Sequence, residues 1–148
     1  MNKFVFKLEP LYEYRQRLQE LCQKEFGEAS KKLEEEETKL QALKDLHRKS
    51  CNEIDDMKER SEEVKDLHLY YDYIAGLKRH IDQQGIIINS VRAAFEKKRS
   101  ELLESTKSTK VIEVIKEKHL DIYNHALNKE EQKTNDDLVT SRFKRSGV

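Results

Sequence analysis

The sequence predicts an all-α protein, folded as a long antiparallel two-helix coiled-coil hairpin. Two compositional observations favour this fold: one proline and four glycines in 148 residues, and a charged fraction of 39%. Sheet proteins and turn-rich enzymes use many more turn residues, whereas long helices are rich in Glu, Lys, Leu and Arg. The mean hydropathy of −0.94 indicates that the chain lines a narrow seam between helices and does not enclose a globular core. The third observation is heptad spacing of apolar residues in both halves.

The first helix is expected to run from about residue 9 to residue 60. Pro10 fits a first helical turn, where a missing N–H costs nothing. A seam follows in which residues three and four apart alternate. Its predicted positions are Phe26, Ala29, Leu33, Glu36, Leu40, Leu43, His47, Ser50, Ile54, Met57, Ser61 and Val64. Upstream, Leu8, Leu11, Leu18, Leu21 and Cys22 form a broader stripe, which predicts a loose seam or one shared with a partner.

The turn is expected at about residues 58–66. This stretch is polar and has no glycine or proline, and Ser61 can cap the helix that follows it. A turn here gives two arms of similar length, each covering the apolar stripe of the other. The main structural alternative is one uninterrupted helix that dimerises.

The second helix is expected from about residue 66 to residue 138, within a single domain that spans residues 1–148. Its seam positions are Ile74, Leu77, Ile81, Gln84, Ile88, Val91, Phe95, Lys98 and Leu102. After Ser105 the pattern weakens and predicts a stammer, with a shifted stripe at Ile112, Ile115, His119, Ile122 and Ala126. The basic tail 139–148 is expected to be disordered by itself.

Several function classes are disfavoured. Lys+Arg and Asp+Glu both number 29, so the chain lacks the basic excess of a nucleic-acid-binding protein. No apolar run approaches the roughly 20 residues that span a bilayer, which predicts a cytoplasmic protein without a transmembrane segment. Phosphate-loop and nucleophile-elbow motifs are absent from the sequence. We therefore expect no catalytic site, no cofactor and no nucleic-acid partner.

The sequence contains one possible metal site. His47 and Cys51 are four residues apart and share a helix face, and a turn near Ser61 could bring His80 opposite them. Closed structural zinc sites need four ligands, and polar residues in a seam commonly set its register. The register interpretation is preferred, and no bound metal is expected.

Tyrosine and aliphatic residues gather early in the second half. Tyr70, Tyr73, Ile74 and Leu77 share one helix face, while Leu67 and Tyr71 share another. Such a cluster is typical of a docking surface, and equally of an aromatic plug that closes the end of the hairpin. The sequence leaves both interpretations open.

Three blocks of the sequence resemble the FliJ family of the bacterial flagellar export apparatus. The first is the opening Phe6-Lys7-Leu8-Glu9-Pro10-Leu11, and the second runs from Tyr70 to Gln84. The third is the polar ending, with Glu130-Glu131-Gln132-Lys133, Asp136-Asp137 and Arg142-Phe143. Their order and separation cover nearly the whole chain.

The resemblance implies a monomeric, stalk-like coiled coil that binds the export ATPase FliI, the export gate protein FlhA and export chaperones. It would couple ATP hydrolysis by the partner to export, as a cytoplasmic protein peripherally associated with the inner-membrane export apparatus. The gate contact is expected at Tyr73, Ile74, Leu77 and Ile81, with His80 and Gln84 at positions where the family varies. The ATPase contact is expected at Leu8, Leu11, Leu18, Leu21 and Phe143. The alternatives are a homologous stalk of a virulence type III secretion system, or a passive coiled-coil scaffold that forms a parallel dimer.

Overall fold

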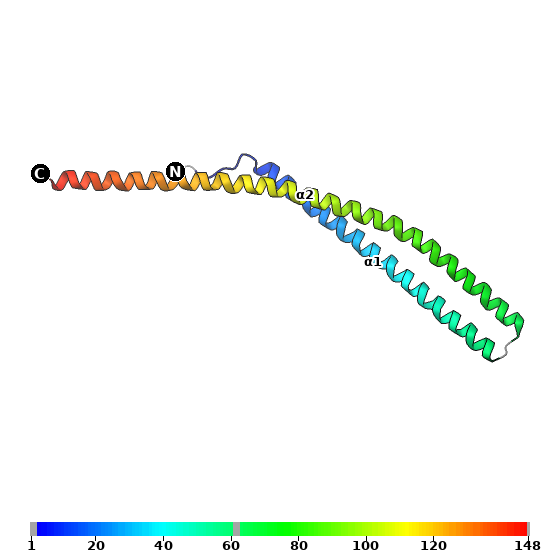
Figure 1. Cartoon of the computed structure of the whole chain (residues 1–148). Coiled ribbons are helices and arrows are strands. Elements are labelled where there is room, and N and C mark those ends of the chain that lie inside the picture. The colour runs from blue at the N-terminus through cyan, green and yellow to red at the C-terminus, as the bar shows by residue number, and fades with distance from the viewer. Residues whose placement is uncertain (1–2, 61–62, 148) are drawn as a thin grey trace. The chain divides into compact units, whose positions relative to one another are not determined.

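The computed structural model describes residues 3–60 and 63–147. Within these residues it contains two elements, helix α1 (Glu9–Glu59) and helix α2 (Val64–Ser146), shown in Figure 1. The described residues include no strand. The predicted all-α fold is confirmed.

The chain divides into two compact units, and each helix contributes to both. The hairpin unit comprises Leu21–Leu103, and the terminal unit comprises Met1–Glu20 with Glu104–Val148. Within each unit α1 and α2 lie side by side and antiparallel (Figure 1). The helices are therefore partners of each other, which confirms the helical hairpin and contradicts the alternative of one uninterrupted helix. Neither described helix holds a stretch long and apolar enough to cross a membrane.

The start of α1 follows from its local sequence. Pro10 lies in the first turn, where its missing N–H removes no intrahelical hydrogen bond. The amide of Glu9 donates to the carbonyl of Phe6 (3.1 Å), and the amide of Tyr12 donates to the carbonyl of Leu8 (2.9 Å). The acidic side chain of Glu9 is also favourably placed at the positive end of the helix dipole.

The connection between the helices falls within the predicted turn. α1 ends at Glu59 and α2 begins at Val64. The amides of Asp66 and Leu67 donate to the carbonyl of Glu63, at 3.1 and 3.2 Å. The predicted cap at Ser61 lies outside the described residues.

The seam of the hairpin unit follows the predicted heptads. Every predicted position from Phe26 to Met57 and from Ile74 to Leu102 is buried or half-buried. The rings of Phe26 and Phe95 meet with centroids 5.1 Å apart. Val64 is exposed, which corrects its assignment to the seam, because it begins α2 at the turn. Burial of a large aliphatic side chain contributes roughly 1.5–3 kcal/mol, so this seam holds the unit together.

The predicted stammer is wrong. On α2 the alternating spacing continues without a break, through Ser105, Thr109, Ile112 and Lys116, all of them buried or half-buried. The sequence pattern misled because polar residues take seam positions here, while Ile122 and Ala126 of the expected stripe are exposed. The polar residues have partners, and Thr109 Oγ1 donates to the carbonyl of Ser105 at 2.9 Å.

The C-terminal end also differs from the expectation. α2 continues to Ser146, well beyond the predicted end near residue 138. The amide of Gly147 donates to the carbonyl of Phe143 at 3.0 Å and closes the last turn. Residues 128–146 are all exposed, so this part of α2 is helical without burying a side chain.

Candidate partner-binding surfaces

The residues expected to contact the export gate lie on the first turns of α2, and the structure separates them by exposure. Tyr73 and His80 are exposed, whereas Ile74 and Ile81 are half-buried. Leu77 and Gln84 are buried in the seam of the hairpin unit. A buried side chain is not available to a partner in this arrangement, so Tyr73 and His80 are the members of the set that a partner can reach fully.

Gln84 has an identifiable structural role. Its Nε2 donates to the backbone carbonyl of Glu36 (3.0 Å) and to Oε2 of the same residue (2.6 Å). The hydrogen bond from Gln84 lowers the pKa of the Glu36 carboxyl, and a second hydrogen bond from Lys39 adds to this effect. A hydrogen-bonded polar pair within an apolar seam fixes which residues face each other, because any slip would leave the pair unsatisfied.

The tyrosine cluster combines both interpretations that the sequence left open. The rings of Tyr70 and Tyr73 meet edge to face with centroids 6.0 Å apart, and Tyr70 is half-buried. Lys58 at the end of α1 lies over the ring of Tyr71 (5.3 Å), and a hydrogen bond with Tyr71 raises the pKa of Lys58. Leu69 stays exposed. The cluster therefore joins the two helix ends at the turn and still presents aromatic surface to solvent.

The residues expected to contact the ATPase are mostly exposed. Leu8, Leu11, Leu21 and Phe143 are exposed, and Leu18 is half-buried. The seam of the terminal unit uses other residues of α1, namely Tyr12, Arg15 and Gln19. These contacts are polar: Thr109 Oγ1 also lies 3.3 Å from the Arg15 carbonyl, and Gln19 Nε2 donates to Thr106 Oγ1 at 3.4 Å. The leucines lie beside the seam and not in it.

The N-terminal segment before α1 forms a strap on α2 that sequence reasoning missed. Phe6 is buried, and its ring meets the edge of the His119 ring with centroids 5.6 Å apart. Phe4 packs on Tyr123, with centroids 5.4 Å apart. The alternation Phe4-Val5-Phe6 before Pro10 was the available signal.

Lys116 anchors this strap. Its Nζ lies 2.8 Å from Oε2 of Glu9 and donates to Oε1 at 3.0 Å. The same ammonium lies 5.1 Å from the ring centre of Tyr12 and 6.0 Å from that of Phe6. A half-buried ion pair bounded by aromatic faces holds the start of α1 against α2.

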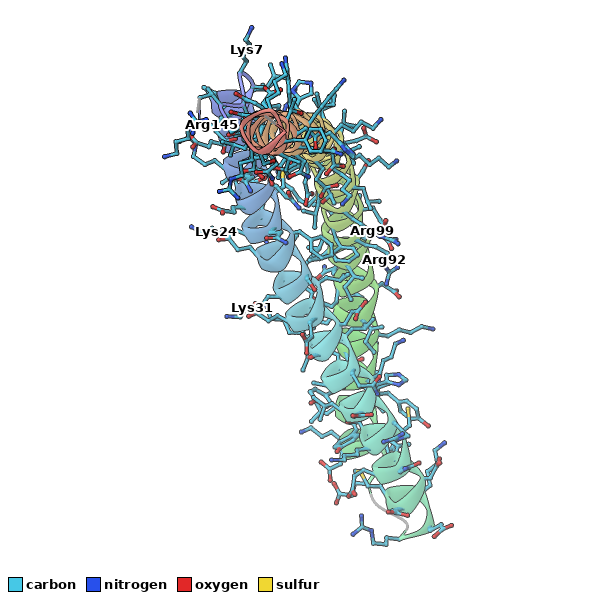
Figure 2. All side chains as sticks on the ribbon, turned by 90° about the vertical axis from the view of Figure 1, so that its left-hand side faces the viewer. Lys7, Lys24, Lys31, Arg92, Arg99 and Arg145 are labelled. Atoms are coloured by element: carbon cyan, nitrogen blue, oxygen red, sulfur yellow. The ribbon has the colours of Figure 1, made fainter. Side chains whose placement is uncertain are left out.

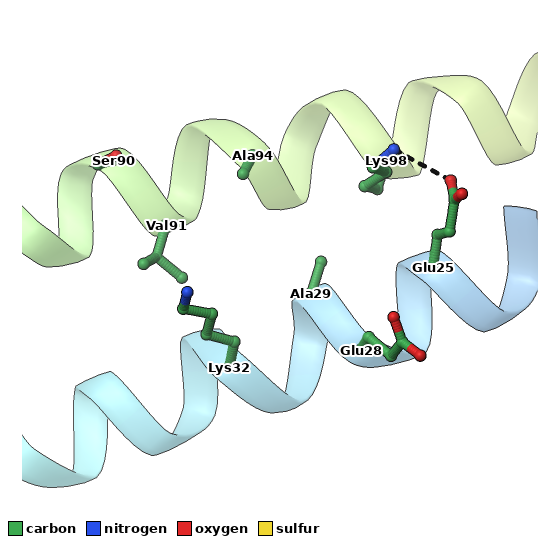
Figure 3. Close-up of a pocket in the computed structure, with 8 residues that line it drawn as sticks. All are labelled: Glu25, Glu28, Ala29, Lys32, Ser90, Val91, Ala94 and Lys98. Carbon is green, nitrogen blue, oxygen red and sulfur yellow. Dashed lines mark hydrogen bonds and ion pairs between the residues drawn. The ribbon is translucent and has the colours of Figure 1, made fainter.

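A hollow lies between the helices of the hairpin unit, lined by Ala29 in the seam and by the exposed Ala94 beside the seam. Ala29 and Ala94 leave a space of about 460 Å³, bordered by Val91 and by a lysine–carboxylate contact (Figure 3). Nζ of Lys98 lies 3.0 Å from Oε2 of Glu25. This contact, followed by a hydrogen bond to Glu101, raises the pKa of Lys98. The hollow is a packing gap that holds no arrangement of nucleophile and base.

The three-ligand metal site that the sequence allowed does not assemble. Sγ of Cys51 lies 3.9 Å from Nδ1 of His47, so these two residues do meet. His80 is exposed, and no group of three His, Cys, Asp or Glu side chains converges within the described part of the chain. Cys22 and Cys51 are both free thiols.

Charged side chains cover the outside of the hairpin unit. Figure 2 shows Lys24 and Lys31 projecting from α1, and Arg92 and Arg99 projecting from α2. Several of these charges form ion pairs along or between the helices, such as Arg92 with Glu37 at 3.4 Å. Exposed pairs of this kind contribute little stability, so this exterior is mainly a solvated surface.

Comparison with known proteins identifies one family. The family model described as "Flagellar FliJ protein" matches residues 4–147, nearly the whole chain. Searches of curated proteins and of solved structures yielded no match.

Proposed function

Because the chain belongs to the flagellar FliJ family, whose members are structural components of flagellar export, we propose that it is a non-enzymatic stalk that binds the export ATPase FliI and the export gate protein FlhA. In this role the chain couples ATP hydrolysis by FliI to export and escorts export chaperones. It acts as a monomer in the cytoplasm, at the inner-membrane export apparatus. The observation that carries this proposal is the family match over residues 4–147.

For the gate, we assign the direct contact to the exposed members of the predicted set. Tyr73 and His80 supply an aromatic ring and an imidazole on the outer face of α2. Half-buried Ile74 and Ile81 supply apolar edges beside them. Leu77 and Gln84 act indirectly, because they fix α2 against α1 and so position the exposed residues.

For the ATPase, the exposed leucines at the start of α1 and just before it support a contact there. Leu8, just before α1, and Leu11, in its first turn, are both exposed, and the seam of the terminal unit uses other residues of α1. Exposed apolar residues at helical spacing are typical of partner-binding surfaces. Phe143 near the end of α2 is also exposed and is flanked by basic residues.

The flagellar assignment is preferred over a virulence secretion system because the matching family model is the flagellar one. A passive parallel-dimer scaffold is disfavoured by the antiparallel pairing of α1 and α2 within each unit.

The test is the effect of the purified chain on purified FliI. We expect the chain to promote hexamer assembly in sedimentation experiments and to raise ATP turnover, while hydrolysing no ATP alone. Unchanged assembly and unchanged turnover would refute the coupling role. Tyr73→Ala should weaken FlhA binding and leave the effect on FliI intact, which separates the two contacts.

A further inference from the structure

The terminal unit carries an apolar row on each helix immediately next to the seam. On α1 the seam residues Tyr12, Arg15 and Gln19 are each preceded by an apolar residue. On α2 the same holds for Ile112, Lys116 and Tyr123. The six preceding residues are Leu11, Tyr14, Leu18, Val111, Ile115 and Ile122.

Helix geometry places the two rows on the same side of the helix pair. Each residue advances about 100° around the axis, so a residue one position before the seam lies about 100° from it. The two helices run in opposite directions and present their seams to each other. In an antiparallel pair of helices that face each other, the residue just before a seam position projects to the same side of the pair on both helices. The rows therefore form a single face that spans α1 and α2.

This face is open to solvent. Leu11 is 40% exposed, Tyr14 50%, Val111 60% and Ile122 67%. Leu18 and Ile115 are half-buried at the edge of the seam. The face therefore adjoins the α1–α2 interface directly. A third helix that packed on the pair would bury such a face. Its residues recur three, four and seven positions apart, which is the spacing that another helix packs against.

The charges beside the face indicate what kind of helix fits. Arg17 on α1 is exposed at its margin, and Lys118 on α2 is exposed within the α2 row, between Ile115 and Ile122. Asp121 is an exposed acidic residue at the α2 margin. Glu104, at one end of the face, is already paired with Lys107 at 3.7 Å. The residues that follow the seam, on the other side of the helix pair, are mostly acidic or polar, such as Glu13, Glu20 and Glu117, with Lys110 and Leu120 as exceptions. Apart from Asp121, the apolar face is therefore accompanied by positive charge, and the opposite face carries more acidic than basic residues.

We propose that this face binds an amphipathic α-helix of a partner protein whose apolar stripe is flanked by Asp and Glu, forming a three-helix arrangement with α1 and α2. The apolar stripe would cover Leu11, Tyr14, Val111 and Ile122, and its acidic flanks would face Arg17 and Lys118. Leu11 and Leu18 also belong to the contact proposed for FliI, but the inference does not require FliI to be the partner.

The probe is a fluorescent synthetic peptide of three heptads, with leucine at the a and d positions and glutamate beside them. Its twin carries lysine in place of glutamate, and both are used below the concentration at which they self-associate. Fluorescence anisotropy with the full chain should show binding of the glutamate peptide and clearly weaker binding of the lysine peptide.

Two matched variants locate the site. V111S/I122S removes two exposed side chains and should weaken binding of the glutamate peptide by about tenfold or more. The control L120S alters an exposed leucine on the other side of the seam and should leave binding unchanged. Circular dichroism melting should be the same for both variants, because the altered side chains are solvent-exposed.

Other outcomes would overturn the proposal. These are no binding of either peptide, equal binding of both, or equal loss in V111S/I122S and L120S. If sedimentation shows that the chain self-associates and V111S/I122S abolishes this, a second copy covers the face and the partner-helix proposal is wrong. Peptide binding without any effect of the chain on FliI would refute the ATPase role and leave this inference standing.

Discussion

The hairpin unit and the terminal unit use the same helix pair in opposite ways. In the hairpin unit the seam is largely apolar, with Ile54, Leu77 and Ile88 buried, and the positions just before the seam on α1 are mostly charged. In the terminal unit the seam holds Arg15 and Lys116, and the positions just before the seam residues Tyr12, Arg15, Gln19, Ile112, Lys116 and Tyr123 are apolar. The heptad spacing is the same in both units. They differ in whether the apolar side chains lie at the seam positions or at the positions just before them.

This difference shows that heptad spacing of the seam residues does not by itself decide whether the apolar side chains are buried in the seam. A helix longer than a few turns needs its apolar stripe covered, and the hairpin unit covers its stripe internally. In the terminal unit, hydrogen bonds and an ion pair occupy much of the seam. These polar contacts fix the register of α1 against α2 more than they add to the stability of the fold. The apolar surface of the terminal unit is left for another molecule. We expect the following changes to test this contrast.

The largest effect is expected from Leu77→Ala. Truncating a buried leucine leaves a cavity and costs about 2–5 kcal/mol of unfolding free energy. Urea unfolding followed by circular dichroism measures this loss. The matched change Tyr73→Ala removes an exposed side chain of the same cluster and should cost much less. Equal losses would mean that Tyr73 also belongs to the packing at the turn.

Phe6→Ala should loosen the terminal unit alone. Removing the buried ring that meets His119 frees the strap and exposes the Glu9–Lys116 ion pair to water. Amide hydrogen exchange should then accelerate at the start of α1, where the free energy of local opening should fall by roughly 1–3 kcal/mol. Exchange around Phe26 and Phe95 should stay unchanged. Val5→Ala, next to it and exposed, is the control. Faster exchange throughout both units would show that the strap stabilises the whole chain.

Ala29→Leu should stabilise the hairpin unit modestly. The added side chain enters the hollow beside Ala94, and filling such a gap commonly adds about 0.5–2 kcal/mol. Thermal unfolding measures the gain. Ala42→Leu places the same side chain at an exposed position and should change the melting temperature little. A lower melting temperature for Ala29→Leu would mean that the gap cannot open far enough to take leucine.

The smallest effect is the pH response of Glu36. Its pKa is lowered in the folded chain, chiefly by the hydrogen bond from Gln84, so folding favours the charged form. The associated stability is present above the unfolded pKa, about 4.3, and is lost as the pH falls through the lower folded value. Melting temperatures between about pH 5 and pH 3 should therefore drop slightly less for Glu36→Gln than for the unaltered chain. Identical slopes would assign this pH response to other carboxyls.

The hairpin unit shows how much of this structure sequence reasoning could reach. The seam positions from Phe26 to Met57 and from Ile74 to Leu102 were predicted correctly because alternating spacing of apolar residues is a local property that can be recognised in one chain. The exposed leucines at Leu8 and Leu11 were found for the same reason, as a stripe that did not fit a simple seam.

The sequence by itself determined two helices, a connection between them after Glu59 and before Val64, and a family resemblance that comparison supports. Only the tertiary structure decided that the seam continues through Thr109 and Lys116, because a polar residue joins a seam only when a partner across it satisfies its hydrogen bonds. It also decided that Phe6 is buried on α2, against His119. Each of these outcomes depends on which residues meet across the seam, and spacing along one chain carries no record of that.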